Sequence, residues 1–394
     1  MKKNSCPVCL SKSISDLYSI SVPVLQNRVF EKTEMARASL KGDISLSFCD
    51  ECNFVFNSTF DNTIIVYDTN YDNSVPSDFF TNYYHQIAEN LYTNYNLKEG
   101  VLYDVGCGKG TFLKILCEKY PDVKAIGIDP SYEGELQVSP NLSFIQDFFK
   151  AEYVLDKPNL VISRHVFEHI ENPVDFLKII STALSNFSNI PFFIEVPDLM
   201  WIIKNNTYWD ICYEHCNYFN QNSFSKMMVL SGAKISNISY GFNKQYLWGK
   251  AVLNATVNIN IPQQIVDGNL KELAGFVQNI GLLKLNSQNV IKSYKEKGYK
   301  IVVWGMATKG VEFCNIVDGE NKLIDYCIDI NQNKQNKFIP FTGHQIMHQS
   351  VIIKDKSPLL VIIMNTNYAT EIITAVTENN PVVCFIDGHG NEVI

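Results

Sequence analysis

A glycine-rich stretch between an apolar strand and an apolar helix constrains this chain of 394 residues more than any other feature. It reads Val101-Leu-Tyr-Asp-Val-Gly-Cys-Gly-Lys-Gly-Thr111, and apolar residues at helical spacing follow it. Because glycine lets the backbone turn sharply and approach a ligand closely, the three alternating glycines predict a turn that borders a binding site. A second apolar strand, Ala125–Asp129, ends in a carboxylate that can hold two vicinal ribose hydroxyls. This order predicts an α/β fold with a doubly wound sheet.

The glycine pattern differs from the G-x-G-x-x-G pattern of dinucleotide-binding folds. Asp104-Val-Gly-Cys-Gly-Lys-Gly110 instead resembles the cofactor loop of class I methyltransferases, which bind S-adenosylmethionine. The resemblance implies that Asp129 holds the cofactor ribose and that Asp147 caps the exocyclic amine of its adenine. The implied cofactor-binding residues are Asp104, Gly106, Cys107, Gly108, Gly110, Asp129, Pro130, Asp147 and His165.

Further strands continue the alternation that a doubly wound sheet requires. Apolar runs at Leu160–Ser163 and Phe192–Val196 are separated by an amphipathic helical segment around Phe176–Ile180. Ligands of such sheets bind beyond the carboxyl ends of the strands. The polar residues that follow these strands are therefore expected near the cleft, namely Glu168, His169, Glu195 and Asp198. For His169, a chemical role and a role in positioning or cofactor-side packing both stay open.

Two Cys-x-x-Cys pairs, Cys6-Pro-Val-Cys9 and Cys49-Asp-Glu-Cys52, lie about 39 residues apart. Each pair can place two thiolates on one side of a cation, and two pairs complete a tetrahedral zinc site. Four cysteine ligands leave no open coordination position, so this zinc is expected to be structural. Unrelated buried or redox-active thiols are the alternative. An N-terminal segment near 60 residues is also marginal on its own core, which favours a metal.

Composition narrows the class of protein. The net charge of −8 argues against a nucleic-acid surface, which needs clustered Lys and Arg. The polar start leads into a cysteine pair rather than an apolar signal segment, and no apolar run reaches the roughly 20 residues of a membrane span. The eleven cysteines are scattered and odd in number, which fits a reducing compartment. We expect a soluble, cytoplasmic protein that does not bind membranes.

Two aromatic segments contain candidate catalytic residues. Residues 61–97 are rich in tyrosine, and Tyr71 is either a packing residue or part of a lid over the site. Trp209-Asp-Ile-Cys-Tyr-Glu-His-Cys-Asn-Tyr-Phe219 places Glu214 beside His215, and a neighbouring carboxylate can raise the basicity of an imidazole. A purely structural Glu–His hydrogen bond and a second metal site with Cys212 and Cys216 are the alternatives.

The last part of the chain predicts a separate α/β domain. A helix is expected from Val266 to Lys297, followed by the strand Tyr299–Trp304 and the turn Gly305-Met-Ala-Thr-Lys-Gly310. Further strands are expected at Leu323–Asp329, Leu359–Ile363 and Val382–Ile386. This Rossmann-like half could bind part of a nucleotide through Lys309 and a helix N-terminus, or act only as a scaffold.

Taken together, these modules resemble the three-domain deoxysugar C-methyltransferases, which methylate C3 of a nucleotide-linked 4-keto-6-deoxysugar. The resemblance rests on the four cysteines, the glycine loop, the Glu-His segment, Trp304-Gly-Met-Ala-Thr-Lys-Gly310 and Asp329-Ile-Asn-Gln-Asn-Lys334. It implies a zinc module at 1–60, a helical linker and lid at 61–97, a methyltransferase core at 98–255 and a Rossmann-like domain at 256–394.

The resemblance also implies a mechanism. A base removes the C3 proton beside the C4 ketone, and the enediolate carbon accepts the methyl group. His215, oriented by Glu214, is the expected base, and His169 or Tyr71 is the oxyanion donor or alternate base. The expected partner is a small-molecule acceptor, a nucleotide-linked sugar, and we expect a monomer.

The chain departs from this family on the acceptor side. The family's Tyr-His-Glu-His becomes Cys212-Tyr-Glu-His215, its Tyr-x-Tyr lid keeps only Tyr71, and its His-Gly-Gly-Ser segment is replaced by Gly241–Trp248. An O- or N-methyltransferase acting on a sugar or another small metabolite is therefore the alternative function. A non-catalytic scaffold is disfavoured by the intact glycine loop and Asp129.

Overall fold

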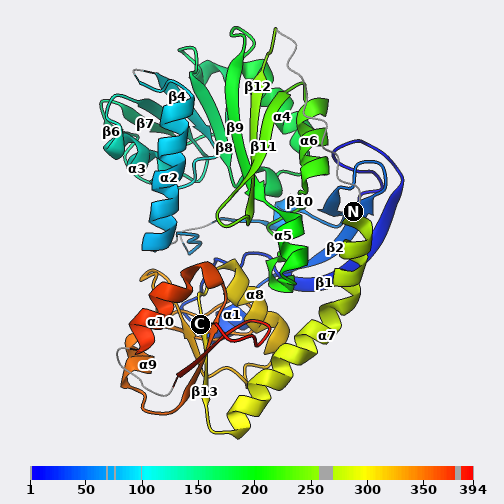
Figure 1. Ribbon diagram of the computed structural model, residues 1–394, viewed down its shortest axis with the longest axis vertical. Helices are drawn as coiled ribbons and strands as arrows, with labels where there is room; N and C mark the ends of the chain where they lie inside the picture. Colours follow the sequence, from blue (N-terminus) through cyan, green and yellow to red (C-terminus); the bar gives the residue numbers. More distant parts are fainter. Residues whose placement is uncertain are drawn as a thin grey trace.

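Three β-sheets organise the part of the chain that the structure describes. The computed structural model describes residues 2–67, 70–74, 77–98, 100–256, 269–377 and 383–393. Figure 1 shows an eight-stranded sheet at one end of the molecule and a five-stranded sheet at the other, with the N-terminal hairpin beside the junction. The predicted α/β class is confirmed.

The eight-stranded sheet has the order β11-β12-β9-β8-β4-β5-β7-β6. Its parallel part consists of β4 (Val101–Val105), β5 (Lys124–Ile128), β7 (Leu142–Ile145), β8 (Leu160–Arg164) and β9 (Ile190–Pro197). Antiparallel strands complete the edges: β6 (Gln137–Ser139), β11 (Lys234–Gly241) and β12 (Tyr246–Leu253). Residues of β8 are buried throughout, as expected where helices cover both faces of a parallel sheet.

Helices cover the two faces of this sheet. On one face, α2 (Asp78–Asn94) and α3 (Thr111–Lys119) share a core with Leu102 of β4. On the other face, α4 (Pro173–Ala183) and α6 (Gln221–Leu230) share a core with Tyr103, the next residue of that strand. Successive side chains of a strand point to opposite faces, so the two cores lie on opposite sides. The short helix α5 (Leu199–Lys204) follows β9.

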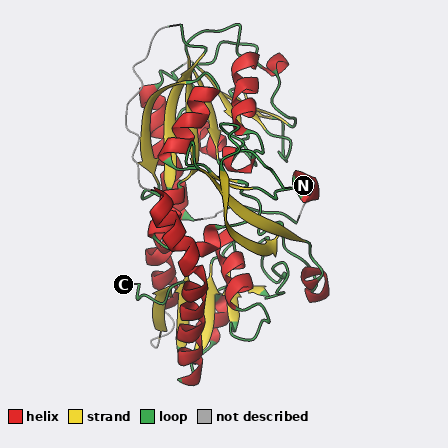
Figure 2. Cartoon of the chain, turned by 90° about the vertical axis from the view of Figure 1, so that its right-hand side faces the viewer, coloured by secondary structure: helices red, strands yellow, loops and turns green. Residues whose placement is uncertain are grey.

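The N-terminal sheet has the order β1-β2-β3-β10 and includes a strand from the middle of the chain. Its strands are β1 (Ile14–Pro23), β2 (Lys41–Cys49), β3 (Val55–Asn57) and β10 (Asn217–Tyr218). The β10 strand pairs antiparallel with β3, and the long β1–β2 hairpin is visible in Figure 2. The N-terminal strands are therefore joined by backbone hydrogen bonds to the segment that follows the eight-stranded sheet's β9.

The five-stranded sheet is parallel and has the order β15-β14-β13-β16-β17. The strands are β13 (Lys300–Trp304), β14 (Tyr326–Ile328), β15 (Ile346–Met347), β16 (Leu359–Ile363) and β17 (Val383–Asp387). Its helices are α7 (Asn269–Glu296), α8 (Thr308–Val317), α9 (Ser350–Lys354) and α10 (Ala369–Thr377). The predicted starts of the α7 helix at Val266 and of the last strand at Val382 lie outside the described residues.

One apolar core connects the N-terminal module to the C-terminal half. Val22 and Ile44 of the β1–β2 hairpin, Leu199 of α5 and Ile301 of β13 belong to the same buried cluster. The remaining short elements are α1 (Thr33–Arg37), η1 (Asn62–Ile64), η2 (Ala151–Tyr153), η3 (Phe167–His169), η4 (Tyr208–Asp210) and η5 (Thr366–Tyr368). Among the described residues, no helix combines the length and the apolar character that crossing a membrane would require.

A buried ionic network lies at the carboxyl ends of β8 and β9. Glu195 is fully buried, and its Oε1 lies 2.9 Å from Arg164 Nη2 and 2.9 Å from His165 Nε2. The Tyr83 hydroxyl and the Trp248 indole N–H donate to its other oxygen. Burial alone would raise the pKa of Glu195, but Arg164 and His165 lower it to about 2.

The same network changes the titration of His165. Burial disfavours the charged imidazole, yet Glu195 and Glu168 outweigh it and raise the pKa of His165 to about 9. The backbone of His165 is left-handed, with φ of 54°, and its ring lies against Glu195. His165 is therefore a cation held between two carboxylates.

The stability of the protein should depend on this imidazolium. Its contribution is fully present below the unfolded pKa near 6.5 and is lost as the pH rises through about 9. The wild-type protein should lose stability between these values, by an amount on the order of 3 kcal/mol, and His165→Gln should lose much less. Urea unfolding followed by circular dichroism at several pH values measures this. An identical pH dependence in both proteins would contradict the expectation.

Candidate active site and metal centre

The glycine turn after β4 has the backbone geometry that the sequence predicts. Gly106, Gly108 and Gly110 have φ angles of 82°, 56° and 72°. The Gly106 N–H donates to the Ile128 carbonyl over 2.8 Å, and the Gly108 N–H donates to Asp129 Oδ2 over 2.8 Å. A Cβ on Gly106 would lie 2.3 Å from Val166, whereas a Cβ on Gly108 would meet nothing within 4 Å. Gly108 thus borders open space.

Two carboxylates border this turn. Asp104 is 4% exposed and its Oδ1 has no hydrogen-bond partner among the described residues. Burial raises the pKa of Asp104 to about 7, although Arg164 acts in the opposite direction. Asp129 Oδ1 accepts from the N–H and the hydroxyl of Ser131, each over 2.7 Å. An orphaned buried carboxylate requires a donor or a cation, and the ammonium group of S-adenosylmethionine fits that requirement.

The other predicted cofactor residues lie around the same edge. Pro130 is exposed directly after Asp129, and Cys107 is half-buried, with a thiol pKa raised by burial. Asp147 accepts from Tyr153 over 2.5 Å and pairs with Lys150, and these hydrogen bonds lower its pKa to about 2. Asp147 is therefore an ionised acceptor.

The Glu214 carboxylate is held by two segments that are distant from it in the sequence. It is 3% exposed, its Oε1 accepts from the backbone N–H of Gln26 over 3.0 Å, and its Oε2 accepts from the Tyr71 hydroxyl over 2.8 Å. Burial raises the pKa of Glu214. Tyr67 packs edge-on against Tyr71, with ring centroids 4.7 Å apart. The structure thus brings Tyr71 to Glu214.

His215 and His169 form the second half of this cluster. Their ring centroids are 4.9 Å apart, and His169 Nδ1 donates to the Glu214 carbonyl over 2.8 Å. Burial and the nearby His169 lower the pKa of His215 to about 3, so this imidazole is neutral at pH 7. The expected orientation of His215 by the Glu214 carboxylate differs from the geometry found, because that carboxylate is bound to Tyr71 and Gln26.

Glu168 joins the histidines without having been assigned a role from the sequence. One donor atom each from Glu168, His169 and His215 lie within 4.8 Å of one another. Glu168 precedes His169 in the loop after a central strand, so the Glu-His pair itself was the available signal.

The four predicted cysteine ligands lie together. The Cys6 and Cys52 sulfurs are 3.6 Å apart, the Cys9 and Cys49 sulfurs are 3.4 Å apart, and all four sulfurs lie within 4.8 Å of one another. This cluster could hold a tetrahedral metal ion. In the described ranges, no comparable group of three ligands includes Cys212 or Cys216.

The turn after β13 lies in the C-terminal half and is occupied by the protein's own side chains. The Met306 N–H donates to Asp329 Oδ2 over 2.7 Å, and its carbonyl accepts from the buried Lys334 over 3.1 Å. Lys309, the predicted nucleotide contact, pairs with Asp210 and lies over the Trp201 ring.

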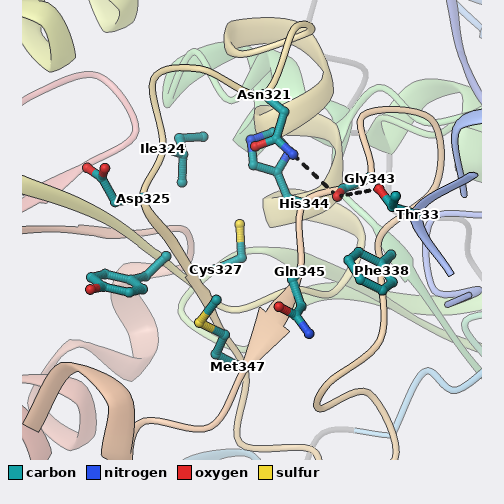
Figure 3. Close-up of a pocket in the computed structure, with 11 residues that line it drawn as sticks. Thr33, Asn321, Ile324, Asp325, Cys327, Phe338, Gly343, His344, Gln345 and Met347 are labelled. Carbon is teal, nitrogen blue, oxygen red and sulfur yellow. Dashed lines mark hydrogen bonds between the residues drawn. The ribbon is translucent and has the colours of Figure 1, made fainter. Parts of the chain in front are cut away.

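A pocket of about 320 Å³ lies elsewhere, beside β14 and the edge strand β15 of the five-stranded sheet (Figure 3). His344 faces it with both ring nitrogens bound, Nδ1 to the Thr342 hydroxyl at 2.9 Å and Nε2 to Asp318 at 3.0 Å. Asp318 also accepts three backbone N–H groups. Both ring nitrogens of His344 and both oxygens of Asp318 thus already have partners within the fold. We therefore do not assign a catalytic role to this pocket.

Comparisons with known proteins match two separate parts of the chain. Residues 79–236 match the family model described as a methyltransferase domain, and residues 264–380 match the C-methyltransferase C-terminal domain. The C-methyltransferase NovU of Streptomyces niveus is 22% identical over 224 residues, which are 54% of this chain and 53% of NovU. The chain thus spans about half the length of this curated relative.

Solved methyltransferases are similar to less than half of the chain. The plantazolicin methyltransferase BpumL in complex with SAH is 16% identical, with a TM-score of 0.35, over 45% of this chain and 89% of that chain. RosA, a dimethyltransferase from Streptomyces davawensis, is 13% identical, with a TM-score of 0.33, over 44% and 55% of the two chains. These TM-scores are too low to bear on function.

The two domain matches fall on the two large sheets, and the first contains the glycine turn described above. The chain therefore contains an S-adenosylmethionine-dependent methyltransferase domain, followed by a C-methyltransferase C-terminal domain.

Proposed function

We propose that this protein transfers the methyl group of S-adenosylmethionine to carbon C3 of a nucleotide-linked 4-keto-6-deoxysugar. One observation carries the proposal: the loop after β8 touches both halves of the site. Val166 packs on Gly106 of the cofactor turn, and three residues later His169 bonds to the Glu214 carbonyl. One short loop thus connects the glycine turn with the histidine cluster. The match to a C-methyltransferase C-terminal domain and the name of the C-methyltransferase NovU support carbon as the acceptor atom.

The residues can perform the proton chemistry that carbon methylation requires. The C4 ketone acidifies the C3 proton, and the neutral His215 accepts it. His169 donates Nδ1–H to a carbonyl, so its Nε2 lone pair faces the cluster and can share that proton. The Tyr71 hydroxyl has one proton, which it donates to Glu214 Oε2. Tyr71 becomes the donor for the developing oxyanion on the acceptor when this O–H turns from Glu214 to the acceptor oxygen. S-adenosylmethionine supplies the electrophilic methyl group, which the enediolate carbon accepts.

Mass spectrometry with labelled S-adenosylmethionine and a panel of nucleotide-linked 4-keto-6-deoxysugars tests this function. Methyl gain on carbon, together with deuterium exchange at C3 in D2O, is the expected result. Methyl gain on oxygen or nitrogen would replace C-methylation by the O- or N-methyltransferase alternative. Cofactor binding without transfer or exchange would reject this acceptor class.

Removing the acid–base groups should slow C3 exchange by different amounts. The rate of C3 exchange should fall about 100- to 10,000-fold in His215→Ala, because a general acid–base group contributes a rate factor of about that size. The rate should fall less in Glu214→Gln and Tyr71→Phe. Tyr67→Phe, which keeps the ring that packs on Tyr71, is the matched control and should stay near wild type. Near wild-type exchange in His215→Ala would remove His215 from the role of base.

Cofactor affinity should depend on the open space at Gly108. In Gly108→Ala, a methyl group enters the space reserved for the ligand, so the Kd for S-adenosylmethionine should rise at least about 10-fold while the fold persists. Gly232→Ala is the control, because Gly232 also has a positive φ and open space but lies outside the turn. Gly106→Ala should instead lower the Tm through its clash with Val166. Isothermal titration calorimetry measures the Kd, and unchanged binding in Gly108→Ala would contradict the assignment.

We also propose that Cys6, Cys9, Cys49 and Cys52 hold one structural zinc ion. Protein purified without chelator should contain one zinc ion per chain, and elemental mass spectrometry measures this zinc content. Cys49→Ser should lose it and melt at a lower temperature, since a structural zinc contributes directly to folding. Cys384→Ser, a half-buried cysteine outside the cluster, should keep its zinc. Metal-free wild-type protein of unchanged Tm would reject the proposal.

A further inference from the structure

Glu168 is a buried carboxylate with an unused oxygen. It is 2% exposed and lies in η3, directly after the loop that follows β8. Its Oε1 lies 3.5 Å from His165 Nδ1, and its Oε2 has no hydrogen-bond partner among the described residues. A buried, unpartnered carboxylate oxygen costs free energy unless a donor or a positive charge meets it during function.

Imidazoles surround this carboxylate. His169 and His215 each place a ring nitrogen within 4.8 Å of it, and His165 lies on its other side. The two carboxylates differ in their partners: both oxygens of Glu214 accept a hydrogen bond, from Gln26 and Tyr71, whereas Glu168 Oε2 accepts none among the described residues. Glu168 is therefore the carboxylate that faces the two histidines of the acceptor side.

The groups that act most strongly on His215 are mostly cationic or become so on protonation. Burial lowers its pKa most, His169, His165 and Lys309 lower it further, and Glu168 raises it. The charged and titratable groups that act on Glu168 itself are His165, His169 and His215. Among the groups that act most strongly on His215, Glu168 is the one that favours its protonated form.

We propose that Glu168 is a positioning residue, whose free oxygen holds the positive charge that forms when the histidine pair accepts a proton from the methyl acceptor. This inference rests on the proposed function. In that step the C3–H bond breaks, its electron pair stays on the acceptor as the enediolate, and the proton goes to the imidazole of His215. The resulting imidazolium faces Glu168, and after methyl transfer the proton returns to solvent.

The test compares Glu168→Gln with a matched buried carboxylate. Glutamine keeps the size of the side chain and removes its charge. Asp198→Asn is the control, because Asp198 is 4% exposed after the neighbouring strand β9, and its side chain accepts from the Met200 N–H over 3.1 Å. Asparagine can keep that hydrogen bond.

The first measurement needs no acceptor. The chain has seven histidines, and NMR of histidine-labelled protein, assigned with His165→Gln, follows the titration of His165 near pH 9. Glu168→Gln should shift this titration to lower pH, and Asp198→Asn should leave it in place. An unchanged titration in Glu168→Gln would overturn the proposal, because Glu168 would then not be an ionised partner of the imidazoles.

The second measurement uses the sugar that the wild type accepts. In Glu168→Gln, C3 exchange should slow about 100-fold, the deuterium isotope effect at C3 should rise, and the Kd for S-adenosylmethionine should not change. Glu168→Asp should recover part of the rate. A slower rate with an unchanged isotope effect would indicate a merely structural role and overturn the proposal.

Two further outcomes separate the possibilities. Exchange that requires added Mg²⁺ or Mn²⁺ would make Glu168, His169 and His215 metal ligands and overturn the proposal. A wild type inactive on every sugar of the panel would reject the proposed acceptor. The histidine titration alone would then decide whether Glu168 faces the imidazoles as an anion.

Discussion

The two hydrogen bonds to the Glu214 carboxylate join segments that lie far apart in the sequence and that build the proposed acceptor side. One donor is the backbone of Gln26 in the N-terminal module, and the other is Tyr71 in the linker. The Gln26 side chain continues to Glu312 of α8 over 2.5 Å, and the adjacent Asn27 donates to Thr308 over 3.0 Å. A buried carboxylate without partners is costly, so all four segments must be in place before the site is complete. The integrity of the cysteine cluster is thereby linked to the geometry of the acceptor side.

Charges of opposite sign alternate along the edge of the core sheet. Arg164 lies against Glu195, Glu195 against His165, and His165 against Glu168. Arg164 also stacks over the rings of Tyr84 and Phe112, which places it beneath the cofactor turn. Desolvation offsets part of the attraction in buried ion pairs. Besides their effect on stability, these pairs fix orientation, since Glu195 and His165 each have a charged neighbour on both sides.

Features set by local spacing could be predicted from the sequence, and features set by tertiary contacts could not. The glycine turn and the two cysteine pairs depend on neighbouring residues, and the structure places both as expected. Adjacency in the chain did not determine the partner of Glu214, because consecutive side chains such as those of Glu214 and His215 can point to different neighbours. The addition of β10 to the N-terminal sheet also escaped prediction, since a two-residue strand has no periodicity to detect.

The two halves of the chain repeat one arrangement of acid and turn. Asp129 binds the Gly108 and Ser131 N–H groups, and Asp329 binds the Met306 and Asn331 N–H groups in the same way. In the second half, the ammonium of Lys334 is buried against the turn. The turn of the C-terminal half is therefore filled by a side chain of the same chain, whereas the turn of the first half borders open space at Gly108. The same arrangement of acid and turn thus occurs once with open space beside it and once with a lysine of the same chain bound to it.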